Sequence, residues 1–274
     1  MTTHEPCGDC GFDHGLELEQ AAEWHNVNPG SYTLQVIRGD CFQIAKQWPR
    51  ECIDLIVTDP PYGSVLTTDW DKTWAIEQYD KLSQLIMHIL KPGGTAYVWG
   101  GIGQVKNRLF LMWLSQIEWQ HGLRLHNLIT WSKKRAYGVK DNYLFTREEC
   151  AMLVKPLPGE RLEDCRPLTF NIPLLDKKRG YAGYNAEYPA KSEYLRRTNV
   201  WSDVTEILRG KIHPAEKPSC LAEIMIKTSS NPNELVVDLF AGSGSTGVAA
   251  RSLGRRCVLI ELSTCLMHQG LVTG

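Results

Sequence analysis

The segment Asp59-Pro60-Pro61-Tyr62 joins a carboxylate to an aromatic ring through a stiff piece of backbone. Two consecutive prolines fix φ and remove two N–H donors, so the loop exposes carbonyl acceptors. The apolar run Ile53 to Thr58 before it is expected to be a strand, and ligands of open α/β sheets bind at the carboxyl ends of strands. The loop is therefore suited to accept hydrogen bonds and to stack on a ring. A structural turn is the alternative, because Pro and Asp are ordinary turn residues.

The chemistry that suits this loop is methylation of an exocyclic base nitrogen. Such an amine is a poor nucleophile, because its lone pair is delocalised into the ring. The Asp59 carboxylate and the Pro60 carbonyl would each take one N–H and aim the lone pair at an electrophilic methyl group. The Tyr62 ring offers a stacking face, which a base reaches only when it is flipped from the duplex. The pattern predicts an amine-methylating site that requires no metal ion.

A glycine-rich turn near the other end of the chain predicts a nucleotide site. The run Leu235 to Phe240 leads into Ala241-Gly242-Ser243-Gly244-Ser245-Thr246-Gly247, which opens a helical pattern. Glu261 follows about 20 residues later, where an acidic residue would bind the ribose hydroxyls of an adenosine. The alternative is a tight strand-to-helix connection in which the glycines only permit positive φ.

The late position of this turn predicts a circularly permuted sheet. Too few residues follow Glu261 to supply the further strands that a nucleotide-binding domain needs. The remaining strands must therefore come from earlier in the chain. We expect Tyr32 to Arg38 to be the third strand and to lie beside the C-terminal second strand.

Apolar, β-branched runs alternate with helix-period stretches along most of the chain. This pattern predicts an α/β, Rossmann-like, doubly wound and mostly parallel sheet of the seven-stranded type, with both faces covered. Trp99, Trp113 and Trp131 are expected in the core. The expected strands are Tyr32 to Arg38, Ile53 to Thr58, Thr95 to Trp99, Leu128 to Trp131, Ala151 to Lys155, Leu235 to Phe240 and Cys257 to Glu261. The expected helices are Ile76 to Leu90 (closed by Lys91-Pro92-Gly93-Gly94), Val105 to Glu118, Ser219 to Ser229 and Gly244 to Leu253.

The stretch 157–211 interrupts this alternation with prolines, aromatic residues and basic clusters, and we interpret it as a small inserted module. The predicted organisation is an N-terminal tail (1–30), a first half-domain (31–156), the insert (157–211) and a second half-domain (212–274). Basic side chains are grouped where they could contact phosphates, although such groups are as often solvated faces. They are Lys133, Lys134, Arg135, Lys177, Lys178, Arg179, Arg196 and Arg197.

The two motifs together resemble the permuted, beta-class amino-methyltransferases of restriction-modification systems and phages, over about residues 31 to 270. Arg38-Gly39-Asp40-Cys41 is similar to the family's motif after the third strand, and His213-Pro214-Ala215-Glu216-Lys217-Pro218 is similar to the stretch before its cofactor region. A plain helix start at Pro218 is the alternative for the latter. The resemblance implies the catalytic residues Asp59, Pro60, Pro61 and Tyr62. It also implies S-adenosylmethionine contacts at Asp40, Cys41, His213, Lys217, Pro218, Asp238, Phe240, Gly242, Gly244 and Glu261.

The resemblance favours N6 of adenine in double-stranded DNA as the target, because the family uses Asp at the first catalytic position mainly for adenine. N4 of cytosine is the alternative. Residues 157–211 would then be the target-recognition region, and a homodimer and a cognate restriction enzyme are the implied partners. A silent DNA-binding module, an RNA substrate and a nicotinamide-dependent dehydrogenase are further alternatives. The dehydrogenase leaves Asp59-Pro60-Pro61-Tyr62 unexplained.

Composition sets outer bounds on these interpretations. With 30 Lys and Arg against 31 Asp and Glu in 274 residues, a nucleic-acid surface has to be a local patch. Nine scattered cysteines, no apolar run of about 20 residues and no leader pattern predict a cytoplasmic protein of a bacterial, archaeal or phage-infected cell. His4, Cys7, Cys10 and His14 form a weak zinc candidate, whose alternative is a loose tail.

Overall fold

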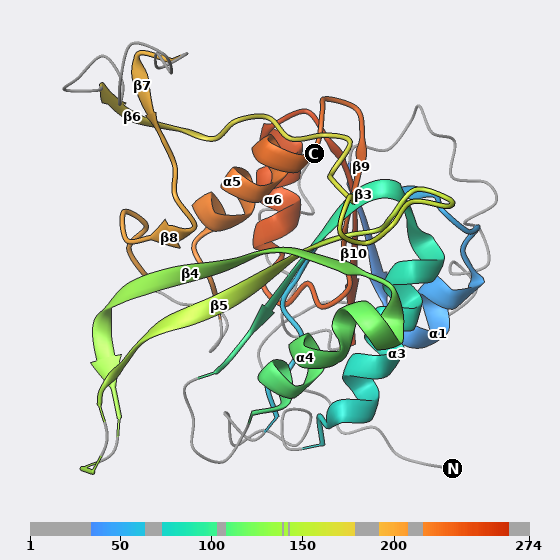
Figure 1. The fold of residues 1–274 in the computed structure, drawn as a ribbon, viewed down its shortest axis with the longest axis horizontal. Helices are drawn as coiled ribbons and strands as arrows, with labels where there is room; N and C mark the ends of the chain where they lie inside the picture. Colours follow the sequence, from blue (N-terminus) through green and yellow to red (C-terminus); the bar gives the residue numbers. More distant parts are fainter. Residues whose placement is uncertain are drawn as a thin grey trace, which may run out of the picture.

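The computed structural model describes residues 34–63, 73–102, 108–138, 140–141, 143–178, 192–207 and 216–262. In these residues a large sheet has the strand order β1-β10-β9-β2-β3-β5-β4-β8, and β6 and β7 form a separate pair (Figure 1). The strands are β1 (Leu34–Arg38), β2 (Ile53–Thr58), β3 (Leu90–Gly100), β4 (Arg124–Tyr137), β5 (Phe145–Val154), β6 (Leu174–Lys178), β7 (Tyr194–Arg196), β8 (Val200–Trp201), β9 (Leu235–Asp238) and β10 (Arg256–Glu261).

The order of the strands confirms the permuted sheet. β1 pairs in parallel with β10, so the strand near the start of the chain lies beside the strand near its end. β5 runs antiparallel to both β3 and β4, and the other neighbours in the large sheet are parallel. The seven expected strands are all present. The two-residue β8 adds an eighth at the edge, beside Thr130 and Trp131 of β4.

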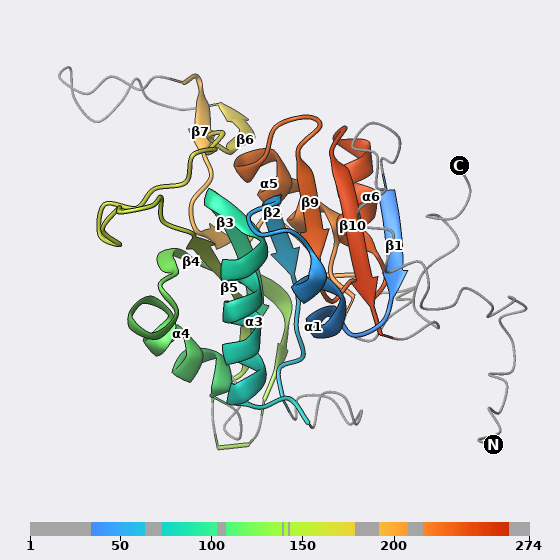
Figure 2. The same cartoon turned by 90° about the vertical axis from the view of Figure 1, so that its right-hand side faces the viewer.

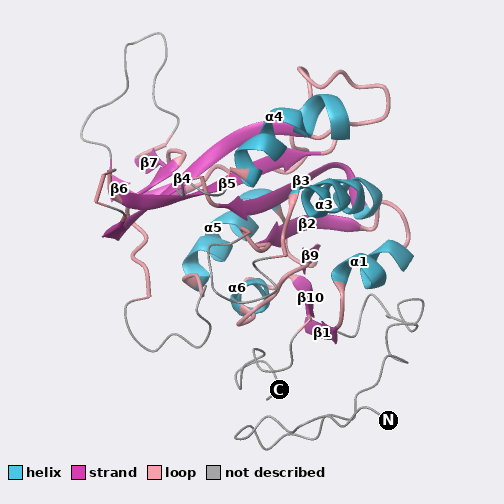
Figure 3. Ribbon diagram, turned by 90° about the horizontal axis from the view of Figure 1, so that it is seen from below, coloured by secondary structure: helices cyan, strands magenta, loops and turns pink. Residues whose placement is uncertain are grey.

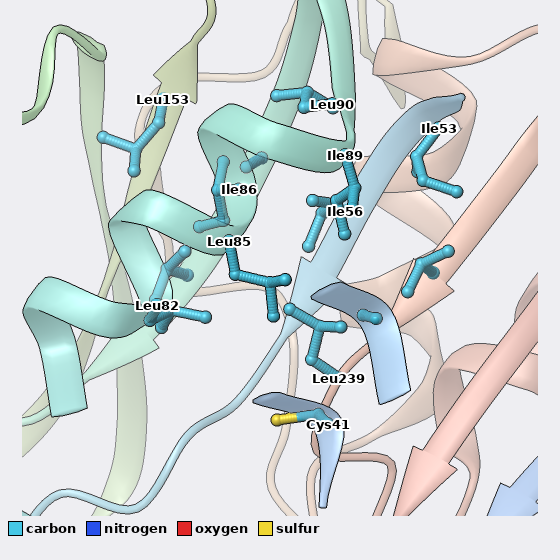
Figure 4. Packing of buried hydrophobic residues seen from close by; sticks show 14 of the residues in the cluster. Cys41, Ile53, Ile56, Leu82, Leu85, Ile86, Ile89, Leu90, Leu153 and Leu239 are labelled. Atoms are coloured by element: carbon cyan, nitrogen blue, oxygen red, sulfur yellow. The ribbon is translucent and has the colours of Figure 1, made fainter. Parts of the chain in front are cut away.

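Helices cover both faces of the sheet, as predicted (Figures 2 and 3). The elements α1 (Cys41–Ile44), η2 (Ala45–Gln47), α3 (Ile76–Ile89) and α4 (Leu109–His121) contribute to one apolar cluster, and α5 (Ser219–Ser229) and α6 (Ser245–Ser252) to a second. Within β2, Ile56 belongs to the first cluster and Leu55 and Val57 to the second, because successive side chains point to opposite faces. Figure 4 shows α3 packed on β2 through Leu85, Ile86 and Ile89.

Several expected boundaries were wrong. The helix expected at Val105 to Glu118 is α4, Leu109–His121, which runs on until Gly122 (φ 70°) ends it. Lys91-Pro92-Gly93-Gly94, predicted to close a helix, lies inside β3, which begins at the residue after α3. Gly93 (φ 75°) donates its N–H to the Lys155 carbonyl, so backbone pairing extends the strand across the turn-like residues. The expected strands Leu128 to Trp131 and Ala151 to Lys155 are the inner parts of longer ones, because β4 and β5 pair as far out as Tyr137 and Phe145.

The three tryptophans expected in the core are buried, and Trp113 is fully enclosed. A search of the described helices for one long and apolar enough to cross a bilayer finds none.

Candidate active site

The proline loop and the glycine turn meet at one edge of the sheet. β2 pairs with β9, so the two loops leave the carboxyl ends of neighbouring strands (Figure 2). Thr58, the last residue of β2, donates its hydroxyl to Asp238 Oδ1 at 3.0 Å, and Asp238 is the last residue of β9. The two predicted motifs, far apart in sequence, therefore belong to one site.

Asp59 and Tyr62 are tied together within the proline loop. The Tyr62 hydroxyl donates to Asp59 Oδ1 at 2.8 Å. Burial raises the pKa of Asp59 above its ordinary value, and the neighbouring Lys217 ammonium opposes that rise. Burial and the Asp59 charge also raise the pKa of the Tyr62 phenol well above its usual range. The loop thus holds a largely buried carboxyl group hydrogen-bonded to a neutral phenol.

Lys217 comes to this loop from the residues just before α5. Its ammonium donates to Asp59 Oδ2, lies 2.9 Å from the Tyr62 hydroxyl, and is 5.3 and 5.1 Å from the ring centroids of Tyr62 and Trp99. The pKa of Lys217 is raised, because two carboxylates outweigh the burial that would lower it. Lys217 was predicted as a cofactor contact, and in the structure its ammonium lies on the Asp59 carboxylate.

Glu148 is a site residue that the sequence analysis missed. It lies in β5, with Oε2 3.2 Å from both the Tyr62 hydroxyl and Lys217 Nζ, and Oε1 accepts a hydrogen bond from Lys133. Burial by itself would raise the pKa of Glu148, but the two ammonium groups lower it to about 2. Nothing local marked Glu148, because it stands in the charged run Arg147-Glu148-Glu149 before the apolar part of β5.

The glycine turn is organised by Asp238. Its carboxylate accepts hydrogen bonds from the Thr58 hydroxyl, from the Thr246 hydroxyl at 2.7 Å and from the Phe240 N–H at 3.1 Å. Burial raises the pKa of Asp238 to about 6, and the three hydrogen bonds oppose that rise. Gly244 has φ 81°, a conformation that side chains disfavour, and α6 begins at the next residue. Asp238 therefore positions the turn.

Glu261 and Asp40 place two acidic side chains beside this turn. Glu261, at the end of β10, accepts the Gly242 N–H at 2.8 Å, and its carbonyl accepts the Gly39 N–H at 2.9 Å. Asp40 caps α1 by accepting the Phe42 N–H at 2.8 Å. The predicted residue Cys41 is buried in the first turn of α1, and burial raises the pKa of its thiol.

Aromatic rings lie between α1 and the glycine turn. The Phe240 ring packs edge-on against Phe42 and Trp74, with centroids 6.2 and 5.4 Å apart. An adenosine group offers hydroxyl and amine donors, which suit the carboxylates of Glu261 and Asp40, and an apolar ring, which suits Phe240. The residues present therefore fit an adenosine-containing cofactor at the predicted position.

A family model described as "DNA methylase" matches residues 53–269. The chain belongs to the DNA methylase family. This membership confirms the prediction of a DNA methyltransferase that uses S-adenosylmethionine. The methylase is 27% identical over 255 residues to the "Type II methyltransferase M2.DpnII" of Streptococcus pneumoniae, covering 82% of this chain and 84% of that protein. It is 27% identical over 258 residues to the "DNA adenine methyltransferase YhdJ" of Escherichia coli (strain K12), covering 88% and 83%.

Solved structures share the fold of the methylase. The PvuII DNA methyltransferase (cytosine-N4-specific) superposes with a TM-score of 0.62 at 18% identity, covering 85% of this chain and 84% of that one. The complex of M1.HpyAVI with S-adenosylmethionine gives 0.57 at 22% identity, covering 85% and 95%. The agreement with both supports a Rossmann-like architecture.

The basic residues of the methylase expected at DNA have different surroundings. Lys133 is paired with Glu148 and lies over the Trp131 ring, so it belongs to the site. Lys134 and Arg135 are exposed on the outer part of the β4–β5 hairpin, where their N–H groups bind Glu206. Four others lie in or next to β6 and β7: Lys177 and Lys178 are exposed, Arg196 stacks on Phe170, and Arg197 is held by Asp203 at 2.6 and 2.8 Å.

Some predicted residues fall outside the described parts of the methylase. They are His213, Arg179 and the zinc candidates His4, Cys7, Cys10 and His14. Among the residues that are described, no group of three or more His, Cys, Asp or Glu is arranged to hold a metal ion. Pro218 directly precedes α5, as the helix-start alternative requires, while its neighbour Lys217 reaches the catalytic loop.

Proposed function

We propose that this methylase transfers the methyl group of S-adenosylmethionine to N6 of adenine in double-stranded DNA. The observation that carries the proposal is the Asp59-Pro60-Pro61-Tyr62 loop at the end of β2, directly beside the glycine turn after β9. Asp at the first catalytic position and the adenine specificity in the name of YhdJ both support adenine as the target.

In the proposed reaction the protein orients the amine and provides hydrogen-bond acceptors for it. Asp59 Oδ2 and the Pro60 carbonyl each accept one N–H of the flipped base, which localises the nitrogen lone pair. The Tyr62 ring stacks on the base. Gly101 leaves room behind that ring, since a side-chain carbon there would lie 3.1 Å from Tyr62 Cδ2. The bound cofactor supplies an electrophilic methyl on a sulfonium. Positioning of the two reactants supplies much of the rate acceleration.

DNA contacts are proposed for the exposed basic side chains of two projecting elements. The β4–β5 hairpin begins at the site and extends beyond the sheet, carrying Lys134 and Arg135 (Figure 1). The pair β6 and β7 carries Lys177, Lys178 and Arg196 and belongs to the proposed recognition region, 157–211. Because such residues neutralise phosphates and release counter-ions, the affinity of the protein for DNA should fall as the salt concentration rises.

Two partners are also proposed. A cognate restriction enzyme is supported by the "Type II methyltransferase" names of relatives. A homodimer is supported by the exposed apolar side chains of α4, which include Leu111, Met112 and Trp119. The molar mass in solution, from light scattering after size exclusion, tests the dimer.

The test is a product analysis. The protein is incubated with S-adenosylmethionine and mixed-sequence double-stranded DNA, the DNA is digested to nucleosides, and methylated species are identified by mass spectrometry. We expect N6-methyladenine that disappears with Asp59→Ala. N4-methylcytosine would keep the reaction and reverse the target base. No product on DNA or RNA, despite stabilisation by the cofactor, would favour a silent DNA-binding protein.

A further inference from the structure

Glu148 contacts the catalytic loop although it belongs to no motif. Its carboxylate lies 3.2 Å from the Tyr62 hydroxyl and 3.2 Å from Lys217 Nζ. Lys133 binds its other oxygen, and the ammonium of Lys133 lies over the Trp131 ring at 5.2 Å. With a pKa of about 2 it is ionised at neutral pH. Glu148 is thus a fixed negative charge beside the reacting groups.

Lys217 occupies the place that the target amine needs. Its ammonium donates to Asp59 Oδ2, the acceptor proposed for the amine, and it lies 2.9 Å from the Tyr62 hydroxyl, at the edge of the proposed base site. The ammonium and the target amine therefore compete for the same carboxylate oxygen. Lys217 therefore has to leave Asp59 before methyl transfer.

The displaced lysine still needs a negative partner. The Lys217 side chain is only 11% exposed, and an ammonium buried without a counter-ion is costly. Glu148 Oε2 already lies 3.2 Å from Nζ, so a small movement keeps Lys217 in an ion pair. Lys133 binds the other oxygen of Glu148, so the Glu148 carboxylate is held in place when Lys217 moves.

We propose that Glu148 is a positioning residue that receives Lys217 when the target amine takes its place on Asp59. The inference rests on the proposed function and deepens it. Without Glu148, Asp59 would be the one carboxylate of the described residues that is paired with Lys217. The target amine would then have to break the Lys217–Asp59 ion pair with no second carboxylate to receive the ammonium. Glu148 acts through Lys217 and does not touch the base.

The experiment is a double-mutant cycle on the full chain. For wild type, Glu148→Gln, Lys217→Met and the double variant, kcat and the KM for an unmethylated DNA substrate are measured at saturating S-adenosylmethionine, and the KM for S-adenosylmethionine is measured at saturating DNA. The matched control is Glu149→Gln. Glu149 is the next residue of β5 and is bound by Thr130 at 2.6 Å and Arg147 at 3.3 Å, outside the site. Circular dichroism checks the folding of each variant.

We expect Glu148→Gln to lower kcat by about 10- to 100-fold, because the Lys217–Asp59 ion pair then has to be broken with no second carboxylate to receive Lys217. The KM for the cofactor should stay unchanged, and Glu149→Gln should behave as wild type. In the Lys217→Met background the Glu148→Gln change should lower kcat by less than about threefold, since no lysine remains to be moved. Glu148→Asp, which keeps the charge, should recover part of the rate.

Other outcomes would overturn the inference. They are a Glu148→Gln variant with wild-type kcat, and an equal loss in both backgrounds, which would mean that Glu148 does not act through Lys217. Should the single Gln variant fail to fold, the Lys217→Met background decides: a double variant as active as Lys217→Met supports the inference, and a folded but inactive one contradicts it. A wild-type protein without product on DNA would instead remove the proposed function itself.

Discussion

Asp59 and Asp238 are two buried or partly buried carboxylates at the ends of neighbouring strands, and their surroundings differ. Asp238 accepts three hydrogen bonds from neutral groups, two of them from the turn that follows it. Asp59 is 25% exposed at its side chain and is bound by a cation, Lys217, and a phenol, Tyr62. Burial raises the pKa of both. One carboxylate is fixed by its own loop, and the other is held by a partner from a distant segment.

The comparison separates a structural carboxylate from a reactive one. Removing any neutral donor from Asp238 leaves a buried acceptor with fewer hydrogen bonds, and nothing replaces that donor. Asp59 can exchange Lys217 for another N–H donor without losing a hydrogen bond. Exchangeable partners suit a group that has to bind a substrate, and permanent ones suit a group that shapes a cofactor loop.

The largest effect is expected from neutralising the exchangeable carboxylate. Asp59→Asn should lower kcat by about 10²- to 10³-fold, because the amide presents a weaker acceptor to the amine. Thermal stabilisation by S-adenosylmethionine should persist, since Asp59 does not shape the glycine turn. A variant that keeps more than about a tenth of the wild-type kcat would remove the distinction between the two carboxylates.

The second effect concerns pH and Asp238. Burial raises its pKa from 3.8 to about 6, so the folded protein keeps this proton to higher pH than the unfolded chain does. Protonated Asp238 therefore contributes about 3 kcal/mol to the free energy of unfolding below about pH 4, and this contribution is lost as the pH rises through 6. Urea unfolding of wild type and Asp238→Asn between pH 4 and 7 measures it. The free energy of unfolding of wild type minus that of Asp238→Asn should fall by about 3 kcal/mol over this range, and a signed difference that stays constant or rises with pH would contradict the assignment.

The smallest effect is expected from removing one neutral donor. Thr246→Val should lower the free energy of unfolding by about 1 kcal/mol, because Asp238 loses one of three hydrogen bonds. Thr58→Val is the matched comparison and should cost more, since the Thr58 oxygen also accepts the Leu239 N–H at 3.2 Å. Urea unfolding at pH 7 measures both. Equal and negligible losses would mean that neutral donors do not hold Asp238.

Local sequence was enough to predict the elements whose partners are local. Asp238, Phe240 and Thr246 form their turn within a few residues, and the nearly continuous apolar run of β2 predicted burial on both faces. The permuted order was predicted from the glycine turn lying after the proline loop along the chain, and the pairing of β1 with β10 confirms it. The outer boundaries of β4 and β5 were missed, because their polar ends are stabilised by pairing with each other and not by burial.

The sequence by itself determined the fold class, the glycine turn and the rigid loop that carries Asp59, because backbone restriction and apolar patterning act over short stretches. Only the tertiary structure decided what surrounds Asp59. Lys217 reaches Asp59 across 158 residues of sequence and Glu148 reaches Tyr62 across 86, and nothing local in either segment specifies that meeting. Side chains from distant segments meet only where the sheet brings them together, so the charges of the catalytic site are a property of the assembled fold.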